Sequence, residues 1–526
     1  CGDTTTPPER ALETLDPNSM QAMQAAILAK ENQPGKAYFE RACATCHNGA
    51  VKKAPHKDMI GLMTPEAIHA VMTTGVMQQE AAQLSDEEKI AVAEYLAGSP
   101  LGMAVADIPQ CADGQTFQGA RGGLSGHWGI QPTNHRHITA AHSGLQQTNL
   151  TALRPKWAVK FPGANRARSQ PALAGGLLFV GSHNGRVYGL DQASGCQVWS
   201  FQASGEVRTG IVVEPYDKQA ETTNIYFGDV LGNAYGLDAA SGTLKWRIRV
   251  DDHPNATVTA SPTLHENTLF IPVSSLEVSL AIDPSYPCCT FRGSILALDA
   301  DTGATRWKTY TIADVPTEQK KNAIGTPMMG PSGAVVWNTP SVDVKRSQIY
   351  FGTGENMSSP ATETSDALFA LDMQTGKVNW VFQATAGDAW NVACDTETPQ
   401  SCPQENGPDF DFGGPTILVN SSVHGDLVVA GQKSGFVHAV NPDTGQLVWQ
   451  TQVGRGGIQG GIHFGMAADK KRIFVPISDM ADGRSYDFPD RPGMHALDIN
   501  TGKILWSTVH EDNCGDRSFC HPGISQ

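Results

Sequence analysis

One motif occurs six times in this 526-residue chain and limits its possible folds more than any other feature. Each copy has a run of alternating apolar residues, then Asp or Asn, two residues, Ser or Thr and Gly, and a second run that ends in tryptophan. Turn residues between two such runs predict a β-hairpin, and recurrence indicates a solenoid or a propeller. The copies lie at residues 185–199, 232–246, 293–307, 366–380, 435–449 and 493–506.

Further apolar runs precede the copies, for example at residues 175–182 and 224–230, and supply the remaining strands of each repeat. Four strands per repeat, arranged radially, form a β-propeller blade. A content of 54 glycines, 32 prolines and only 17% charged residues fits such a turn-rich β fold. Trp157 is interpreted as the end of an earlier set of strands.

The first hundred residues follow a helical pattern instead. Apolar residues recur at helical spacing over residues 19–30 and 84–98, and Ser85 with Glu88 predicts a capping box at the start of the second helix. A single core stops growing at about 250–300 residues, so a chain of this length is expected to form at least two units.

Cys43, Cys46 and His47 form a Cys-x-x-Cys-His motif within this helical part. Its two thiols bond the vinyl groups of a c-type haem, and the adjacent histidine ligates the iron. The alternative is a redox motif or half of a zinc site, but the helical context and the lack of a second Cys-x-x-Cys favour haem c.

Residues 30–98 resemble the small class I cytochromes c, which place a methionine ligand shortly before a closing helix. The resemblance implies that Met77 is the sixth iron ligand and that Met59, Met63 and Met72 line the haem pocket or the core. The expected domains are a tether, a cytochrome c domain, a linker and a propeller, over residues 1–19, 20–100, 101–124 and 125–526.

Charge and hydropathy argue against nucleic-acid binding and against a membrane-spanning helix. The formal net charge of -15 and the pI near 5.5 argue against nucleic acid, which needs a basic surface. No apolar run reaches the roughly 18 residues of a membrane-spanning helix. The opening Cys1-Gly-Asp resembles a processed bacterial lipoprotein, so we expect a membrane contact through a lipid on Cys1 only; the alternative is an arbitrary boundary.

The eleven cysteines fit an oxidising compartment, the periplasm. After Cys1 and the haem-binding pair are set aside, eight cysteines remain, and the sequence alone does not determine how they pair. Short separations favour local loops from Cys394 to Cys402 and from Cys514 to Cys520. Cys111, Cys196 and the adjacent Cys288 and Cys289 complete the set.

The repeats over residues 125–526 resemble the tryptophan-docking motifs of the eight-bladed quinoprotein alcohol dehydrogenases. The resemblance implies an all-β eight-bladed propeller that binds pyrroloquinoline quinone (PQQ). Because six complete motifs are present, we expect the ring to be incomplete here and the natural chain to continue for about 100 residues; a propeller with fewer blades is the alternative.

The same resemblance assigns site residues. Trp337, in a segment that runs into Gly-Thr-Gly-Glu, takes the role of the tryptophan that stacks on PQQ, and Cys288 and Cys289 take the role of an adjacent cysteine pair that covers its other face. This pair stands one blade later than in the methanol-type enzymes, so the alternative is that each cysteine pairs elsewhere or stays free. Glu277 and Glu355 are the implied calcium ligands.

The resemblance also implies a catalytic base and further PQQ contacts. Asp388, within Gly-Asp-Ala-Trp-Asn, takes the role of the base that accepts the hydroxyl proton, although Asn391 replaces the second aspartate of the family pattern. Arg208, Thr259 and Lys433 match contacts of the cofactor, and Arg168 is a weaker match. Each of these could equally cap a surface loop.

An amino-terminal cytochrome joined to such a propeller resembles the cytochrome-containing polyvinyl-alcohol dehydrogenases. The expected function is oxidation of secondary or polymeric alcohols by hydride transfer to PQQ, followed by electron transfer through haem c to an external cytochrome c or other acceptor. The alternatives are a haem-bearing scaffold without PQQ, similar to outer-membrane assembly lipoproteins, and a PQQ enzyme for small alcohols or sugars.

Overall fold

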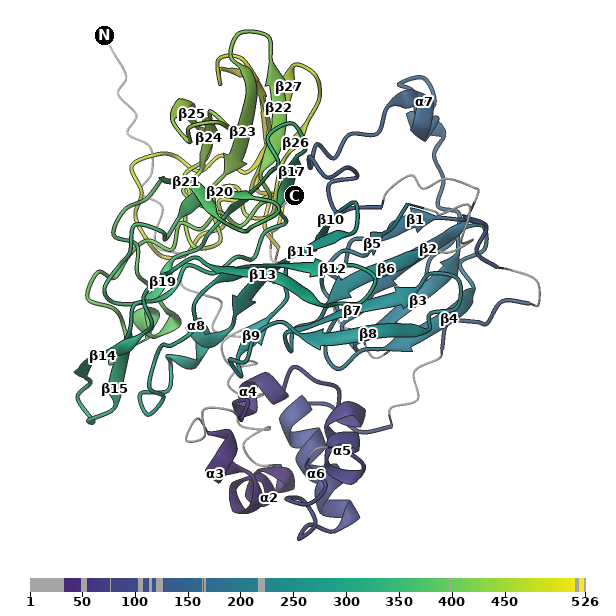
Figure 1. Ribbon diagram of the computed structural model, residues 1–526, viewed down its shortest axis with the longest axis vertical. Coiled ribbons are helices and arrows are strands. Elements are labelled where there is room, and N and C mark those ends of the chain that lie inside the picture. Colours follow the sequence, from purple (N-terminus) through teal and green to yellow (C-terminus); the bar gives the residue numbers. More distant parts are fainter. Residues whose placement is uncertain are drawn as a thin grey trace.

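The computed structural model describes residues 33–48, 54–75, 77–102, 107–112, 116–119, 126–162, 164, 167–215, 223–396, 399–515 and 520–524. The predicted tether with Cys1 and the predicted helix over residues 19–30 lie outside these ranges. Figure 1 shows a small helical unit (purple and dark blue) beside a larger assembly of β-sheets.

The helical unit packs around one core and has the capping box that the sequence predicts. Its last helix begins where the Ser85 side chain accepts from the Glu88 backbone N–H and the Glu88 carboxylate accepts from that of Ser85. Phe39, Ile68 and Val92 lie in the shared core. The helices are α2 (Pro34–Ala42), α3 (Ala44–His47), α4 (Lys57–Ile60), α5 (Pro65–Thr73) and α6 (Asp86–Ala97).

Six antiparallel sheets, each built on four strands in chain order, follow in the described part of the chain, one for each repeat. The first sheet contains β1 (Ala172–Ala174), β2 (Leu177–Gly181), β3 (Arg186–Asp191) and β4 (Gln197–Gln202). The second contains β5 (Val212–Val213), β6 (Asn224–Gly228), β7 (Asn233–Asp238) and β8 (Leu244–Arg249). The third contains β10 (Thr263–His265), β11 (Thr268–Ser275), β12 (Ser294–Asp299) and β13 (Thr305–Tyr310), with β9 (Ala256–Thr257) paired to β11.

The last three sheets repeat this order. The fourth contains β17 (Ser341–Asp343), β18 (Gln348–Gly352), β20 (Ala367–Asp372) and β21 (Val378–Gln383). The fifth contains β22 (Ile417–Ser421), β23 (Gly425–Gly431), β24 (Phe436–Val440) and β25 (Leu447–Gln452). The sixth contains β26 (Ala467–Ala468), β27 (Arg472–Ile477), β28 (Gly493–Asp498) and β29 (Ile504–Val509). Six repeats thus give six blade-type sheets; the eight-bladed ring stays a prediction.

Shorter elements lie before, within and between the sheets. Two strand pairs are β14 (Thr317–Lys321) with β15 (Pro327–Gly330) and β16 (Ser332–Gly333) with β19 (Asn356–Ser358). The short helices are α7 (Ala140–Ser143), η2 (Leu150–Ala152), α8 (Glu277–Leu280) and η3 (Val392–Asp395).

The repeated tryptophans join each sheet to the next. Trp246, near the end of the second sheet, donates its indole N–H to the Ala300 carbonyl in the turn of the third sheet, at 2.8 Å. Its ring covers Gly303, where φ is +73° and a Cβ atom would lie 2.8 Å from the indole, so only glycine fits. Trp157 covers the first repeat in the same way, donating to the Gln192 carbonyl at 3.2 Å.

Loss of one of these tryptophans is expected to destabilise the propeller. Trp246 is 8% exposed, so Trp246→Ala should lower the free energy of unfolding by about 3–5 kcal/mol, through lost burial and the cavity left behind. Trp506 has the same place in the sixth repeat but is 39% exposed, so Trp506→Ala is the matched control with a much smaller loss. Denaturant unfolding followed by circular dichroism measures both; equal losses would contradict the docking role.

Four disulfides are present in the described residues. Cys394–Cys402 and Cys514–Cys520 close the two local loops that the sequence predicts. Cys111–Cys196 ties the predicted linker to β4, where Cys111 N–H also donates to the Gln197 carbonyl. In the part of the chain that the structure describes, no helix has the length and apolar character needed to cross a bilayer.

Candidate active site

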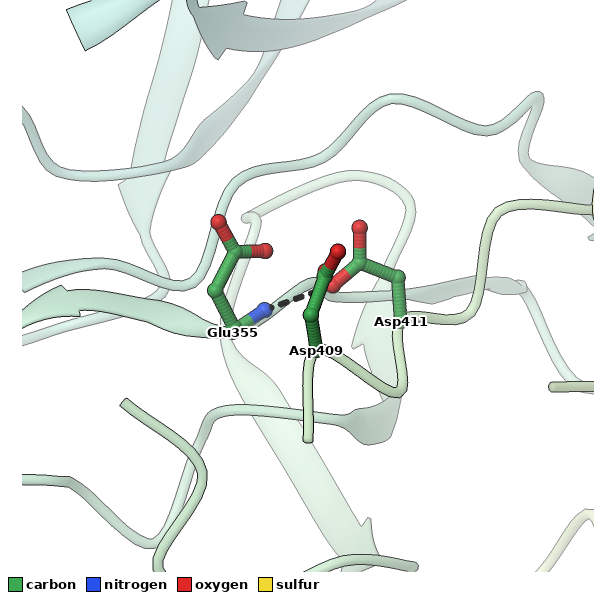
Figure 2. Close-up of side chains that lie close together, drawn as sticks. All are labelled: Glu355, Asp409 and Asp411. Carbon is green, nitrogen blue, oxygen red and sulfur yellow. Dashed lines mark hydrogen bonds between the residues drawn. The ribbon is translucent and has the colours of Figure 1, made fainter. Parts of the chain in front are cut away.

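Three buried carboxylates meet inside the propeller. Glu355 follows β18, whereas Asp409 and Asp411 lie in the irregular segment between η3 and β22. Each offers an oxygen within 4.8 Å of the others, and all three are buried. Figure 2 shows their carboxylates side by side, with the Glu355 backbone N–H donating to Asp411 Oδ1 at 2.9 Å.

A lysine faces this acidic group. Lys433 Nζ donates to Asp409 Oδ1 at 2.8 Å and lies 3.1 Å from Asp411 Oδ2. Burial and the neighbouring carboxylates raise the pKa of Glu355 well above its usual range, and burial also raises that of Asp409. Burial opposes ionisation of Asp411, but Lys433 and the bonds from Glu355 bring its pKa to about 2.

The donor set fits a hard divalent cation. Three carboxylates and one ammonium sum to a formal charge of minus two when all are ionised, and such charge is costly in a buried site without a counter-ion. Carboxylate oxygens are the ligands that Ca²⁺ takes. Glu355 is therefore placed where the sequence analysis expects a cation ligand, but its partners are Asp409 and Asp411.

Trp337 lies directly beside the acidic group. Its indole N–H donates to Asp411 Oδ2 at 2.9 Å, and Lys433 Nζ lies 5.4 Å from the ring centroid. The half-buried ring packs against an apolar cluster that contains Cys288 and Cys289. The structure thus brings Trp337, Lys433 and Glu355 together, as the resemblance implied.

Cys288 and Cys289 form a disulfide with each other across a cis peptide bond. Both side chains are completely buried, and they belong to the same apolar cluster as Trp337. The alternative pairings that the sequence left open are therefore wrong. The pair's later place in the chain still brings it to the cluster on which Trp337 packs.

Glu277 does not join the acidic group. Its carboxylate, 0% exposed, accepts from the Tyr286 hydroxyl at 2.9 Å and from the backbone N–H groups of Thr290 and Phe291 at 2.9 and 2.7 Å. These donors lie on both sides of the cysteine pair. Among the described residues, Glu277 is not one of the three carboxylates whose oxygens lie within 4.8 Å of one another, so its role as a cation ligand stays a prediction. Its oxygens hold the loop that carries the disulfide.

Asp388 is also fully buried, and its oxygens are engaged. Oδ1 accepts from the Asp409 N–H at 3.2 Å, and Oδ2 accepts from the Phe410 N–H at 2.9 Å. Burial raises the pKa of Asp388, and burial together with the nearby Asp388 raises that of Asp366. Asp388 therefore holds the segment that presents Asp409. Asn391 bonds the carbonyls of Met357 and Ser401 instead.

The other predicted cofactor contacts differ in position. Arg208 is half-buried and lies near His463, whose pKa falls to about 3 through burial, Lys433 and Arg208. Thr259 is half-buried and Arg168 is exposed, and within the described ranges neither donates a hydrogen bond to the acidic group.

Asp409, Asp411 and His463 were missed by the sequence analysis. The His463 ring lies 5.7 Å from that of Trp337. A usable signal was the segment Pro-Asp-Phe-Asp-Phe-Gly-Gly over residues 408–414, where two acidic residues stand among apolar ones.

The haem motif is arranged as a c-type site requires. Cys43 and Cys46 are both free thiols, and His47 ends α3. His47 Nδ1 lies 2.7 Å from the Pro55 carbonyl, and a proton on Nδ1 leaves Nε2 as the iron ligand. Met77 packs half-buried against the same core as Cys43.

The other three methionines lie in the same part of the cytochrome unit. Met63 is half-buried like Met77, whereas Met59 and Met72 are buried. The burial of Met59 and Met72 matches the expected place in the pocket or core.

Comparisons with known proteins agree with both units. The family described as "Glucose/ethanol/alcohol dehydrogenase, beta-propeller domain" matches residues 126–399, and "Cytochrome C oxidase, cbb3-type, subunit III" matches residues 30–96. "Outer membrane protein assembly factor BamB" matches residues 433–517.

Two curated relatives cover nearly the whole chain. A polyvinylalcohol dehydrogenase of Pseudomonas sp is 35% identical over 97% of this chain and 81% of its own length. One of Sphingopyxis sp. (strain 113P3) is 32% identical over 94% and 78%. The crystal structure of quinohemoprotein alcohol dehydrogenase from Comamonas testosteroni is similar in fold, with a TM-score of 0.55, 17% identity and coverage of 76% and 68%.

Proposed function

The chain belongs to the family of PQQ-dependent alcohol dehydrogenases that includes the polyvinylalcohol dehydrogenases, and we propose that it oxidises secondary hydroxyl groups of polyvinyl alcohol or a related polymer. It is a quinohaemoprotein, with a cytochrome c domain ahead of the propeller. The observation that carries the proposal is the buried group of Glu355, Asp409 and Asp411 against Trp337 and Lys433. A scaffold has no use for this arrangement.

Each side chain of the site has a separate proposed role. PQQ, when bound, supplies the acceptor for the hydride of the alcohol carbon. Glu355, Asp409 and Asp411 would hold Ca²⁺, which acts as a Lewis acid. Trp337 and the Cys288–Cys289 disulfide offer flat apolar surfaces for a ring, and Lys433 and Arg208 supply positive charge for its oxygens.

Asp409 is the proposed proton acceptor for the substrate hydroxyl. Both oxygens of Asp388, the base that the sequence predicts, accept backbone N–H bonds. Asp409 accepts a bond from Lys433 through Oδ1, whereas its Oδ2 accepts no hydrogen bond from the described residues, so one oxygen would serve the cation site and the other the proton. Asp388 would then be a positioning residue, because its oxygens hold the backbone of Asp409 in place. Both assignments place the base beside the acidic group, because Asp388 bonds the backbone N–H of Asp409.

Met77 is proposed as the sixth ligand of the haem iron. Met77→Ala should remove the sulfur-to-iron absorption band and lower the haem potential, because a methionine ligand raises it. Met63→Ala is the matched control, since Met63 is a half-buried methionine of the same core, and should leave the band in place. Loss of the band in Met63→Ala alone would assign the ligand to Met63.

We further propose a periplasmic location with a lipid on Cys1. Four disulfides support an oxidising compartment. Cys1 lies outside the described residues, so its lipidation is a proposal from the sequence alone.

The substrate is tested with the holoenzyme, loaded with PQQ and Ca²⁺, in a dye-reduction assay on polyvinyl alcohol, short secondary alcohols, primary alcohols and sugars. The polymer and secondary alcohols should give the highest kcat/KM. Preference for primary alcohols or sugars would overturn the substrate, and no turnover with any compound would overturn the proposed function.

A further inference from the structure

In the described part of the chain, a contact between two rings joins the cytochrome unit to the propeller. The rings of His56 and Tyr286 meet edge to face with their centroids 6.1 Å apart. His56 precedes α4 and Tyr286 follows α8, which lie near each other in Figure 1. We propose that this contact is the route by which electrons pass from the propeller cofactor to the haem, an inference that rests on the proposed function.

On the cytochrome side, His56 is joined directly to the haem-ligand segment. His47 bonds the Pro55 carbonyl at 2.7 Å, and Pro55 is covalently bonded to His56. His56 is only 3% exposed, and its Nδ1 accepts from the Asp58 N–H at the start of α4. Its Nε2 has no hydrogen-bond partner among the described residues. The ring is thus fixed at the boundary, and its contact across that boundary is with Tyr286.

On the propeller side, Tyr286 is held rigidly beside the cysteine pair. Its hydroxyl donates to Glu277 at 2.9 Å and accepts from Asn255 Nδ2 at 2.9 Å. Its carbonyl accepts the Cys288 N–H at 2.8 Å. Cys288 is disulfide-bonded to Cys289 in the cluster on which Trp337 packs. Glu277 therefore helps to fix the ring that faces the cytochrome unit.

The links from His47 to Cys289 form a path of covalent bonds, hydrogen bonds and one ring contact, and Cys289 shares an apolar cluster with Trp337. Electron transfer slows steeply across gaps through space, so a bonded path with a single short gap is favoured over one across solvent. His56 and Tyr286 are the ring-bearing members of this path, and neither belongs to the haem ligands or to the quinone site.

The proposed route conserves the electrons and protons that the alcohol loses. The alcohol would lose its hydroxyl proton to Asp409 and its carbon-bound hydrogen as a hydride, so two electrons and two protons leave it in total. PQQ, when bound, would take the hydride and release that proton to solvent as its electrons leave. A haem held by Cys43, Cys46 and His47 would take the two electrons one at a time, each reducing ferric to ferrous iron, and would pass each to an external one-electron acceptor such as another cytochrome. The rings of His56 and Tyr286 and the disulfide are unchanged at the end.

Stopped-flow mixing of alcohol with the holoenzyme, without external acceptor, measures the route as the rate of ferrous haem formation. His56→Leu should slow this rate on the order of tenfold, and His56→Phe, which keeps a ring, should restore most of it. Turnover with a dye that takes electrons from the propeller, the ferrous haem spectrum and the haem potential should not change. His69→Leu, a half-buried histidine on α5, is the matched control and should match wild type.

Several outcomes would overturn the route. Unchanged haem reduction in His56→Leu, equal slowing in His56→Phe, or a parallel fall in dye-linked turnover would each do so. A shift in haem potential that accounts for the slower rate would also do so. If wild type gives neither dye turnover nor haem reduction, the proposed function fails instead, so the two failures are distinguishable.

Discussion

Asp409→Asn is expected to lower kcat about 10²–10⁴-fold, the contribution of a positioned general base. The amide keeps an oxygen for a cation and for Lys433 Nζ, which lies 2.8 Å from Asp409 Oδ1, but it cannot take the hydroxyl proton. The quinone and haem spectra should persist. Steady-state kinetics with the PQQ-loaded and Ca²⁺-loaded variant measure the loss.

Asp388→Asn is expected to act differently. Its amide can accept only one of the two backbone N–H bonds from Asp409 and Phe410, and its NH₂ group would face the other donor. We expect a loss of about 1–3 kcal/mol in the free energy of unfolding and weaker retention of PQQ. Asp372→Asn, in an exposed blade turn, is the control and should keep full activity.

The two variants separate the two assignments. A stable, PQQ-loaded Asp388→Asn protein without turnover, together with an active Asp409→Asn protein, would make Asp388 the base that the sequence predicts. The opposite result assigns the proton to Asp409 and leaves Asp388 as a positioning residue.

The sequence predicts those parts of the fold that depend on contacts between residues close together in the chain. Each blade contains a hairpin whose Asp or Asn side chain bonds its own turn, as Asp372 does with Thr375 at 2.7 Å. The capping box of Ser85 and Glu88 and the loop from Cys394 to Cys402 are local as well. Such features follow from spacing alone, which is why six repeats led to six sheets.

The acidic group could be predicted only in part, because long-range contacts assemble it. Asp411 is positioned by the Glu355 N–H, 56 residues away, and by its own carbonyl, which accepts from the Lys433 N–H. The segment that carries Asp411 shows neither the apolar alternation of a strand nor the apolar spacing of a helix. Glu277 shows the converse: its sequence context suggests a ligand, but the N–H groups of Thr290 and Phe291 reach its oxygens once the loop folds back.

The acidic group also links the binding of a cation to the stability of the fold. Glu355 and Asp409 have raised pKa values in the metal-free protein, so each contributes stability below its unfolded pKa of about 4 that is lost as pH rises through the folded value. A bound cation requires the ionised carboxylates, so its affinity rises with pH. A cation at 100 times its Kd adds about 2.7 kcal/mol to the free energy of unfolding.

Removal of the cation is therefore expected to lower Tm more at about pH 8 than at about pH 5. Thermal unfolding of the Ca²⁺-loaded and the chelated protein at both pH values measures this difference. Glu355→Gln should shrink the difference at the higher pH, because one charged ligand is lost, whereas Glu363→Gln, an exposed control eight residues later, should leave it unchanged. A difference that is the same at both pH values and insensitive to Glu355→Gln would place the cation elsewhere, and Glu355, Asp409 and Asp411 would then be a proton-binding group rather than a metal centre.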